Sequence, residues 1–166
     1  MADDIDALFK LPPGEFTAAR NALAARLKKA GEKALADEAR ASPKPSVPAW
    51  VVNQLYWQHR KAFDRLIESA DRYRQAQAKQ RTHNPAALRE PLEARRTAQA
   101  ELLQIAGKLL TDAGHSETRD MLRRVTTTLE ALAAYGSTPD APRAGRLTAE
   151  LTPPGFEMLA GLLPSN

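Results

Sequence analysis

The residues with the clearest chemical potential are the cations of a stretch from residue 74 to residue 96. The stretch holds six basic side chains against Glu90 and Glu93, and this excess equals the formal net charge of +4 of the whole chain. Arginine and lysine can contact phosphates without a preformed pocket, and each contact adds affinity and salt dependence. The basic side chains of this candidate nucleic-acid-binding site are Arg74, Lys79, Arg81, Arg89, Arg95 and Arg96.

The same stretch has a structural interpretation, which its composition by itself favours. Gln, Ala, Lys and Arg are typical of solvated helix ends. The stretch contains no Phe, Tyr or Trp on which a base could stack, and no recognised nucleic-acid-binding motif. An isoelectric point near 9.6 allows an anionic partner without requiring one. Binding of DNA, RNA or another anionic polymer is therefore a hypothesis that rests on charge placement.

A second candidate is a surface for a protein partner, a second copy of the chain or a small ligand. Trp50 and Trp57 lie within about 20° of each other around a helix and nearly opposite its main apolar stripe. Aromatic side chains with a polar rim are typical of interaction hot spots, whereas a helix that is apolar all round is usually buried. Both interpretations stay open, and burial is favoured. The residues of this candidate surface are Arg20, Lys44, Ser46, Trp50, Asn53, Gln54, Trp57 and Lys61.

The sharpest small-ligand version places an anion between Arg20 and Lys44 at the start of the helix that Ser46 begins. Other enzymatic signals are weak. The three histidines share no metal-ligand spacing, and no phosphate-binding glycine loop or paired nucleophile and base occurs. The absence of cysteine excludes disulfides and thiol catalysis. We therefore predict a non-enzymatic protein with no catalytic residue, no metal site and no cofactor.

The elements that would position these residues are helices, because alternating strand patterns are nearly absent. We predict an all-α fold, in which residues 1–166 form a single helical domain, a helical bundle with a long antiparallel hairpin. The expected helices run from Pro13 to Gly31, from 32 to 41, from 47 to 81 and from Pro85 or, more firmly, Pro91 to Gly114. Two more follow, from Ser116 to Gly136 and from 154 to 163 beyond a loop at about 137–145.

The two long helices carry their apolar stripes on the halves away from the connection between them. The stripe of the first helix stops at Tyr73, and the stripe of the second begins at Leu102. The turn end of the hairpin, at about 74–96, should therefore project into water. Asp3, Asp4 and Asp6 form an acidic start that we interpret as a solvated tail.

The chain has no predicted export signal and no stretch near the roughly 20 apolar residues of a membrane span. We expect a cytoplasmic protein with no membrane partner.

Three stretches carry a resemblance to a known family. They are LPPGEFTAARNALAARLKKAG at 11–31, KPSVPAWVVNQL at 44–55 and GRLTAELTPPGF at 145–156. Together they resemble a widespread family of small, helical, uncharacterised bacterial proteins with an LPPxEFxxAR helix and a KPSxxAWxxN segment. The resemblance implies a bacterial cytoplasmic protein and no particular activity. It directs attention to the patterned positions Arg20, Lys44, Ser46, Trp50 and Asn53, whereas Trp57 and the cations of 74–96 lie outside the pattern.

Overall fold

The structure is a computed structural model that describes residues 2–79, 85–136 and 138–154. Over these ranges the chain is all-α and has no strand, which confirms the predicted fold class. In chain order the elements are α1 (Ala2–Leu8), α2 (Pro13–Lys29), α3 (Lys33–Ala41), α4 (Val47–Gln58), α5 (Arg60–Lys79), α6 (Pro85–Asp112), α7 (Arg119–Tyr135) and the short 3₁₀ helix η1 (Ala144–Arg146).

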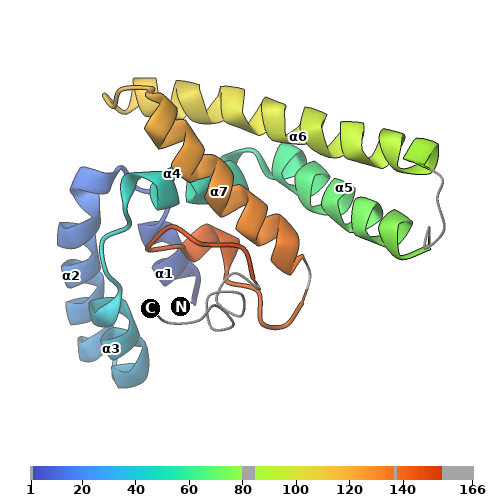
Figure 1. Ribbon diagram of the computed structural model, residues 1–166. Coiled ribbons are helices and arrows are strands. Elements are labelled where there is room, and N and C mark those ends of the chain that lie inside the picture. The colour runs from blue at the N-terminus through green and yellow to red at the C-terminus, as the bar shows by residue number, and fades with distance from the viewer. Residues whose placement is uncertain (1, 80–84, 137, 155–166) are drawn as a thin grey trace, which may run out of the picture.

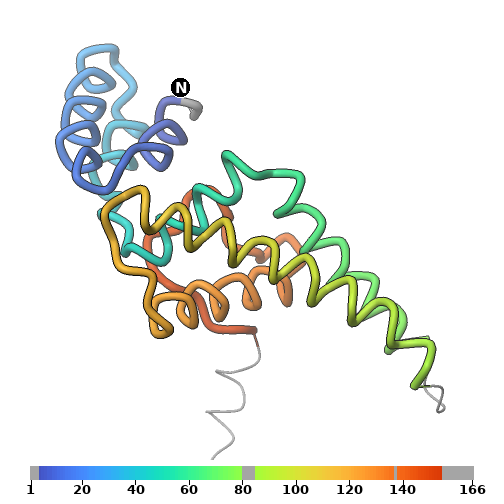
Figure 2. The backbone as a smooth tube through the Cα atoms, turned by 90° about the horizontal axis from the view of Figure 1, so that it is seen from above, coloured from blue at the N-terminus to red at the C-terminus, as the bar shows by residue number. Residues whose placement is uncertain are grey.

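The buried apolar side chains fall into two clusters. The smaller cluster joins α1, α2 and α3 through residues such as Ile5, Phe16 and Leu27. The larger joins α4, α5, α6 and α7 through residues such as Leu55 and Leu102. Figure 1 shows the first three helices gathered on one side of α4 and the remaining long helices on the other, and Figure 2 shows the same division from above. Helix α4 therefore lies where the two groups meet.

Helices α5 and α6 form the predicted antiparallel hairpin, which projects from the rest of the molecule (Figures 1 and 2). At its base, Leu66 of α5 and Leu102 and Ala98 of α6 belong to the larger core. Toward its far end, Lys79 and Arg89 are exposed. The apolar halves hold the two helices together, and the polar halves form an arm. Residues 80–84 lie outside the described residues, and with them Arg81 and His83.

The predicted continuous helix over 47–81 is wrong, because the backbone breaks at His59 (φ −129°, ψ 47°). The rings of Tyr56 and Phe63 pack across the break in a T-shaped arrangement with centroids 5.5 Å apart. The guanidinium of Arg60 stacks on the Tyr56 ring at 4.0 Å. These contacts stabilise the bend, which lets α4 stay between the two cores while α5 runs out along α6.

The structure decides two further expectations. Helix α6 begins at Pro85, the first of its two expected starts, and not at Pro91, which it includes although a proline inside a helix removes one backbone hydrogen bond. The acidic start is not a solvated tail, since α1 buries Ile5 and Leu8 in the smaller core. Asp4 pairs with Arg26 at 3.4 Å, and Asp6 pairs with Arg146. The spacing of Ile5, Leu8 and Phe9 on one helix face was the signal for this element.

The helix ends follow local chemistry. Ser46 caps α4, because its Oγ accepts a hydrogen bond from the Ala49 N–H at 3.3 Å. Gly31, Gly114 and Gly136 all have positive φ at the ends predicted for their helices. The start of α7 lies later than predicted, with Thr118 rather than Ser116 as its cap. The expected helix at 154–163 lies outside the described residues apart from Pro154.

No helix in the described ranges is both long enough and apolar enough to span a bilayer.

Candidate functional site

One face of α4 holds the segment that connects α1 to α2. Trp50 is 8% exposed, and its indole N–H donates to the carbonyl of Leu11 at 2.8 Å. One turn further on, the Gln54 side-chain amide donates to the carbonyl of Phe9 at 2.6 Å. The backbone groups of this segment are thus satisfied by side chains of a helix instead of by a neighbouring strand.

Other side chains of α4 hold η1 and the segment that follows it. The Asn53 amide group donates to the Leu147 carbonyl at 2.8 Å, and its oxygen accepts from the Leu147 N–H, also at 2.8 Å. The Trp57 indole N–H donates to the Gly145 carbonyl at 2.9 Å. Asn53 is completely buried, so this reciprocal pair is shielded from water. Segments from opposite ends of the chain are therefore fixed on the same helix.

The start of α4 is tied to the same C-terminal segment. The Ser46 N–H donates to the Thr148 carbonyl at 3.0 Å, and the Ser46 hydroxyl donates to the Glu150 carboxylate at 2.9 Å. Partial burial raises the pKa of Glu150, but the hydrogen bonds from Ser46 and Arg124 outweigh this effect, so the net pKa lies below its ordinary value. A carboxylate beside the helix start disfavours an anion there.

The candidate partner surface is therefore largely internal. Trp50, Asn53 and Gln54 are buried, which is the interpretation favoured for this face, and they do not form an accessible Trp50/Trp57 surface. Arg20 donates to the carbonyl of Ser42 at 3.0 Å and so holds the connector between α3 and α4. Lys44 and Lys61 are exposed. The expected anion pocket is not formed by these residues, because Ser46 faces Glu150 and Trp50 is sealed.

On the hairpin, Arg74 differs from the other candidate cations. One guanidinium nitrogen donates to the Ala133 carbonyl at 2.5 Å, and another pairs with Asp71. The positive charge lies at the C-terminal end of α7, where the helix dipole favours a cation. Arg74 therefore fastens α7 to α5, and it is not an available cation of the arm.

Four of the candidate cations remain available. Among the described side chains, no carboxylate lies within 4.0 Å of Lys79, Arg89, Arg95 or Arg96, whereas Arg72 pairs with Glu90 at 3.7 Å. The guanidinium carbon of Arg95 lies 6.0 Å from the centroid of the Tyr73 ring. Arg95 is half-buried, and the other three are exposed. Among the described side chains, the arm thus presents four cations that form no ion pair.

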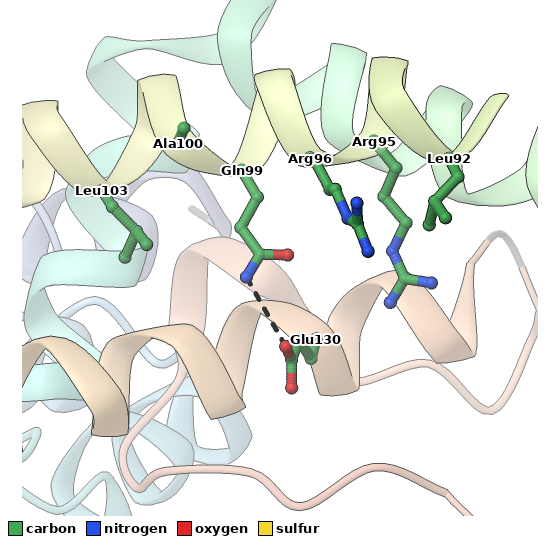
Figure 3. Close-up of a pocket in the computed structure, with 7 residues that line it drawn as sticks. All are labelled: Leu92, Arg95, Arg96, Gln99, Ala100, Leu103 and Glu130. Atoms are coloured by element: carbon green, nitrogen blue, oxygen red, sulfur yellow. Dashed lines mark hydrogen bonds between the residues drawn. The ribbon is translucent and has the colours of Figure 1, made fainter. Parts of the chain in front are cut away.

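Arg95 and Arg96 also line an open groove between α6 and α7 with a volume of about 390 Å³. Figure 3 shows both guanidinium groups extending from α6 toward α7, with Leu92 beyond them and Gln99 on the other side. The Gln99 amide group approaches the carboxylate of Glu130 on α7 at 3.5 Å. The lining residues are Leu92, Arg95, Arg96, Gln99, Ala100, Leu103 and Glu130.

The sequence identified only the two arginines of this groove. The remaining lining residues were missed because the groove depends on how α7 crosses α6, and no local pattern records that angle. Leu92 was the available signal, since it is one of two leucines in a stretch that otherwise consists of polar residues, Ala and Pro. In the described residues, no three His, Asp or Glu side chains gather in a way that could hold a metal ion.

Fold and site together define an all-α protein with a projecting basic arm. Comparison with protein-family models, curated proteins and solved structures finds no match for this chain. The resemblance to a bacterial family described above therefore stays a prediction. Its patterned positions nevertheless have a physical role here, because Ser46, Trp50 and Asn53 bind the other two stretches of the pattern to α4.

Proposed function

We propose that this is a non-enzymatic protein of the bacterial cytoplasm that binds nucleic acid through the α5–α6 hairpin. The observation that carries the proposal is the pair Arg95 and Arg96, which lie side by side on a projecting arm and face an open groove. Among the described side chains, neither has a carboxylate within 4.0 Å. Lys79 and Arg89 are further exposed cations toward the far end of the arm.

Whether a cation already has a carboxylate partner matters, because binding to a phosphate polymer draws its free energy from the release of counterions. A cation that already has a carboxylate partner must give up that partner before it contacts a phosphate. Arg74 and Arg72 have such partners, whereas Arg95 and Arg96 do not. We therefore assign the contacts to Lys79, Arg89, Arg95 and Arg96, and we expect Arg74 to contribute little.

The test is the affinity of the protein for a fluorescently labelled oligonucleotide, measured by anisotropy between 50 and 200 mM salt. For four contacts with a single strand, at about 0.7 per phosphate, affinity should fall roughly 50-fold over this range. The double variant Arg95→Gln/Arg96→Gln should bind more weakly and lose only about sevenfold over the same range, because two contacts remain.

The matched control is Lys28→Gln/Lys29→Gln, which removes the same charge from exposed positions at the end of α2, away from the arm. It should retain the salt dependence of the parent protein. Absence of any binding at 50 mM salt contradicts the proposal. Equal losses in both double variants also contradict it, since binding would then depend on net charge and not on the arm.

The alternative is a protein-interaction module or homo-oligomer that uses a Trp50/Trp57 face. The contacts of the two tryptophans do not favour it. Trp50 is buried under the segment that precedes α2, and the Trp57 indole is hydrogen-bonded to Gly145. A monomeric mass by light scattering and the blue-shifted emission of a buried indole are the results expected here. A dimer whose formation shifts tryptophan emission would restore the alternative.

A further inference from the structure

The two ends of the α6–α7 groove differ in their lining. The two guanidinium groups lie toward one end beside Leu92, while Ala100 and Leu103 provide apolar lining toward the other end, beyond Gln99. The carboxylate of Glu130 and the amide of Gln99 form a polar pair between the two helices. An anion that filled the whole groove would meet the Glu130 carboxylate. The arrangement suits a ligand that is anionic at one end and neutral, flat and polar-edged at the other.

A nucleotide has this division of chemistry. Its phosphate matches the paired arginines, and its base has apolar faces with hydrogen-bonding groups around the edge. Carboxylate and amide side chains are common partners of base edges, and a carboxylate accepts from an exocyclic amino group. A volume of about 390 Å³ falls in the range of small-molecule sites, roughly 300–1,000 Å³. One base could enter beside α7 while its phosphate stays at the arginines.

The state of the nucleic acid follows from the need to expose that base. In a duplex the bases are stacked and their pairing edges are occupied, so the groove could receive only the backbone of a duplex. Unpaired bases of a single strand can leave the stack and lie against protein side chains. Building on the proposed function, we infer that this groove receives an unpaired base of single-stranded nucleic acid, with its phosphate held by Arg95 and Arg96.

The experiment fills the groove without changing its charge. Ala100 lines the groove and is exposed, so Ala100→Leu adds bulk there while keeping a strong helix former on α6. Anisotropy is measured with a labelled single strand and with a duplex of the same length. The parent protein should prefer the single strand, and Ala100→Leu should weaken that complex at least about fivefold. Its salt slope and its affinity for the duplex should stay unchanged.

Two controls isolate the groove. Ala25→Leu places the same side chain at an exposed position of α2 and should alter neither complex. Circular dichroism should show that Ala100→Leu keeps the parent helicity and melting temperature. Glu130→Gln should reduce discrimination between oligocytidine and oligouridine, because it removes the carboxylate that accepts from an amino group.

The experiment distinguishes failure of this inference from failure of the proposed function. Equal binding of single strand and duplex, with no effect of Ala100→Leu, overturns the inference and leaves the proposed function in place. Equal weakening of both complexes by Ala100→Leu also overturns it, since the groove would then not select an unpaired base. If poly-glutamate at equal charge concentration displaces the single strand, the groove recognises an acidic polypeptide or charge alone, and the inference is overturned. Binding of neither nucleic acid overturns the inference and the proposed function together.

Discussion

Asn53 offers the most direct test of how α4 holds the C-terminal segment. Its side chain donates to the Leu147 carbonyl and accepts from the Leu147 N–H, both at 2.8 Å. Asn53 is fully buried, and Leu147 is only 5% exposed. Replacement by alanine removes both partners at once and leaves two backbone groups with little access to water.

The expected loss of stability follows from those two groups. A buried donor or acceptor that loses its partner costs about 1–3 kcal/mol. Two such groups give roughly 2–6 kcal/mol, which water entering the vacated space would move toward the lower end. For a chain of this size, each kcal/mol lowers the melting temperature by about 2–4 °C, so Asn53→Ala should melt roughly 10 °C below the parent.

The assay is urea unfolding followed by circular dichroism, with thermal melts in parallel. Gln104→Ala is the matched control, since it removes an amide side chain from an exposed position of α6 and should stay within about 0.5 kcal/mol of the parent. Amide exchange at Leu147 should accelerate in Asn53→Ala and not in the control. A change below about 0.5 kcal/mol in Asn53→Ala would refute the role assigned to this pair.

Three other changes test the remaining contacts. Gly145→Ala should destabilise the protein by about 1–3 kcal/mol and change tryptophan emission, because the new Cβ would lie 2.7 Å from ring atoms of both Trp57 and Tyr56; parent-like emission and stability would contradict this packing. Arg74→Gln should lower the melting temperature, because the α7 end loses its cation, while weakening oligonucleotide binding less than Arg95→Gln does; the reverse ranking would return Arg74 to the binding surface. The lowered pKa of Glu150 means that its carboxylate stabilises the fold above about pH 4.5 and that this contribution disappears at lower pH. Glu150→Gln should therefore show a shallower fall in melting temperature between pH 5 and pH 3, and an unchanged slope would contradict the sign.

The sequence predicted elements whose causes are local. Ser46 and Gly31 mark helix ends because the cap chemistry involves backbone groups only a few residues away. The bend at His59 had no such signal, since neither glycine nor proline occurs there. It depends on tertiary contacts, such as Tyr56 against Phe63, that only the folded chain brings together.

The candidate site was likewise predicted from the sequence only in part. The excess of cations at 74–96 was visible in the sequence, but the availability of each cation was not. Arg74 and Arg95 are the same residue type in the same stretch, yet Arg74 is bound to α7 and Arg95 faces the groove. The difference depends on where α7 ends relative to α5. Charge counts therefore indicate a basic region, and only packing separates binding residues from structural ones.

Most of the hydrogen bonds that fasten both segments to α4 join a side chain of the helix to a main-chain atom of a segment. Trp50 and Gln54 bind carbonyls of Leu11 and Phe9, which every amino acid possesses. Random mutagenesis should therefore show that the two residues of each bond differ in their tolerance to substitution. Almost every substitution at the helix positions should be destabilising, while the positions whose carbonyls accept should tolerate any residue of suitable size. Libraries that diversify this protein can vary the accepting positions and should leave α4 untouched.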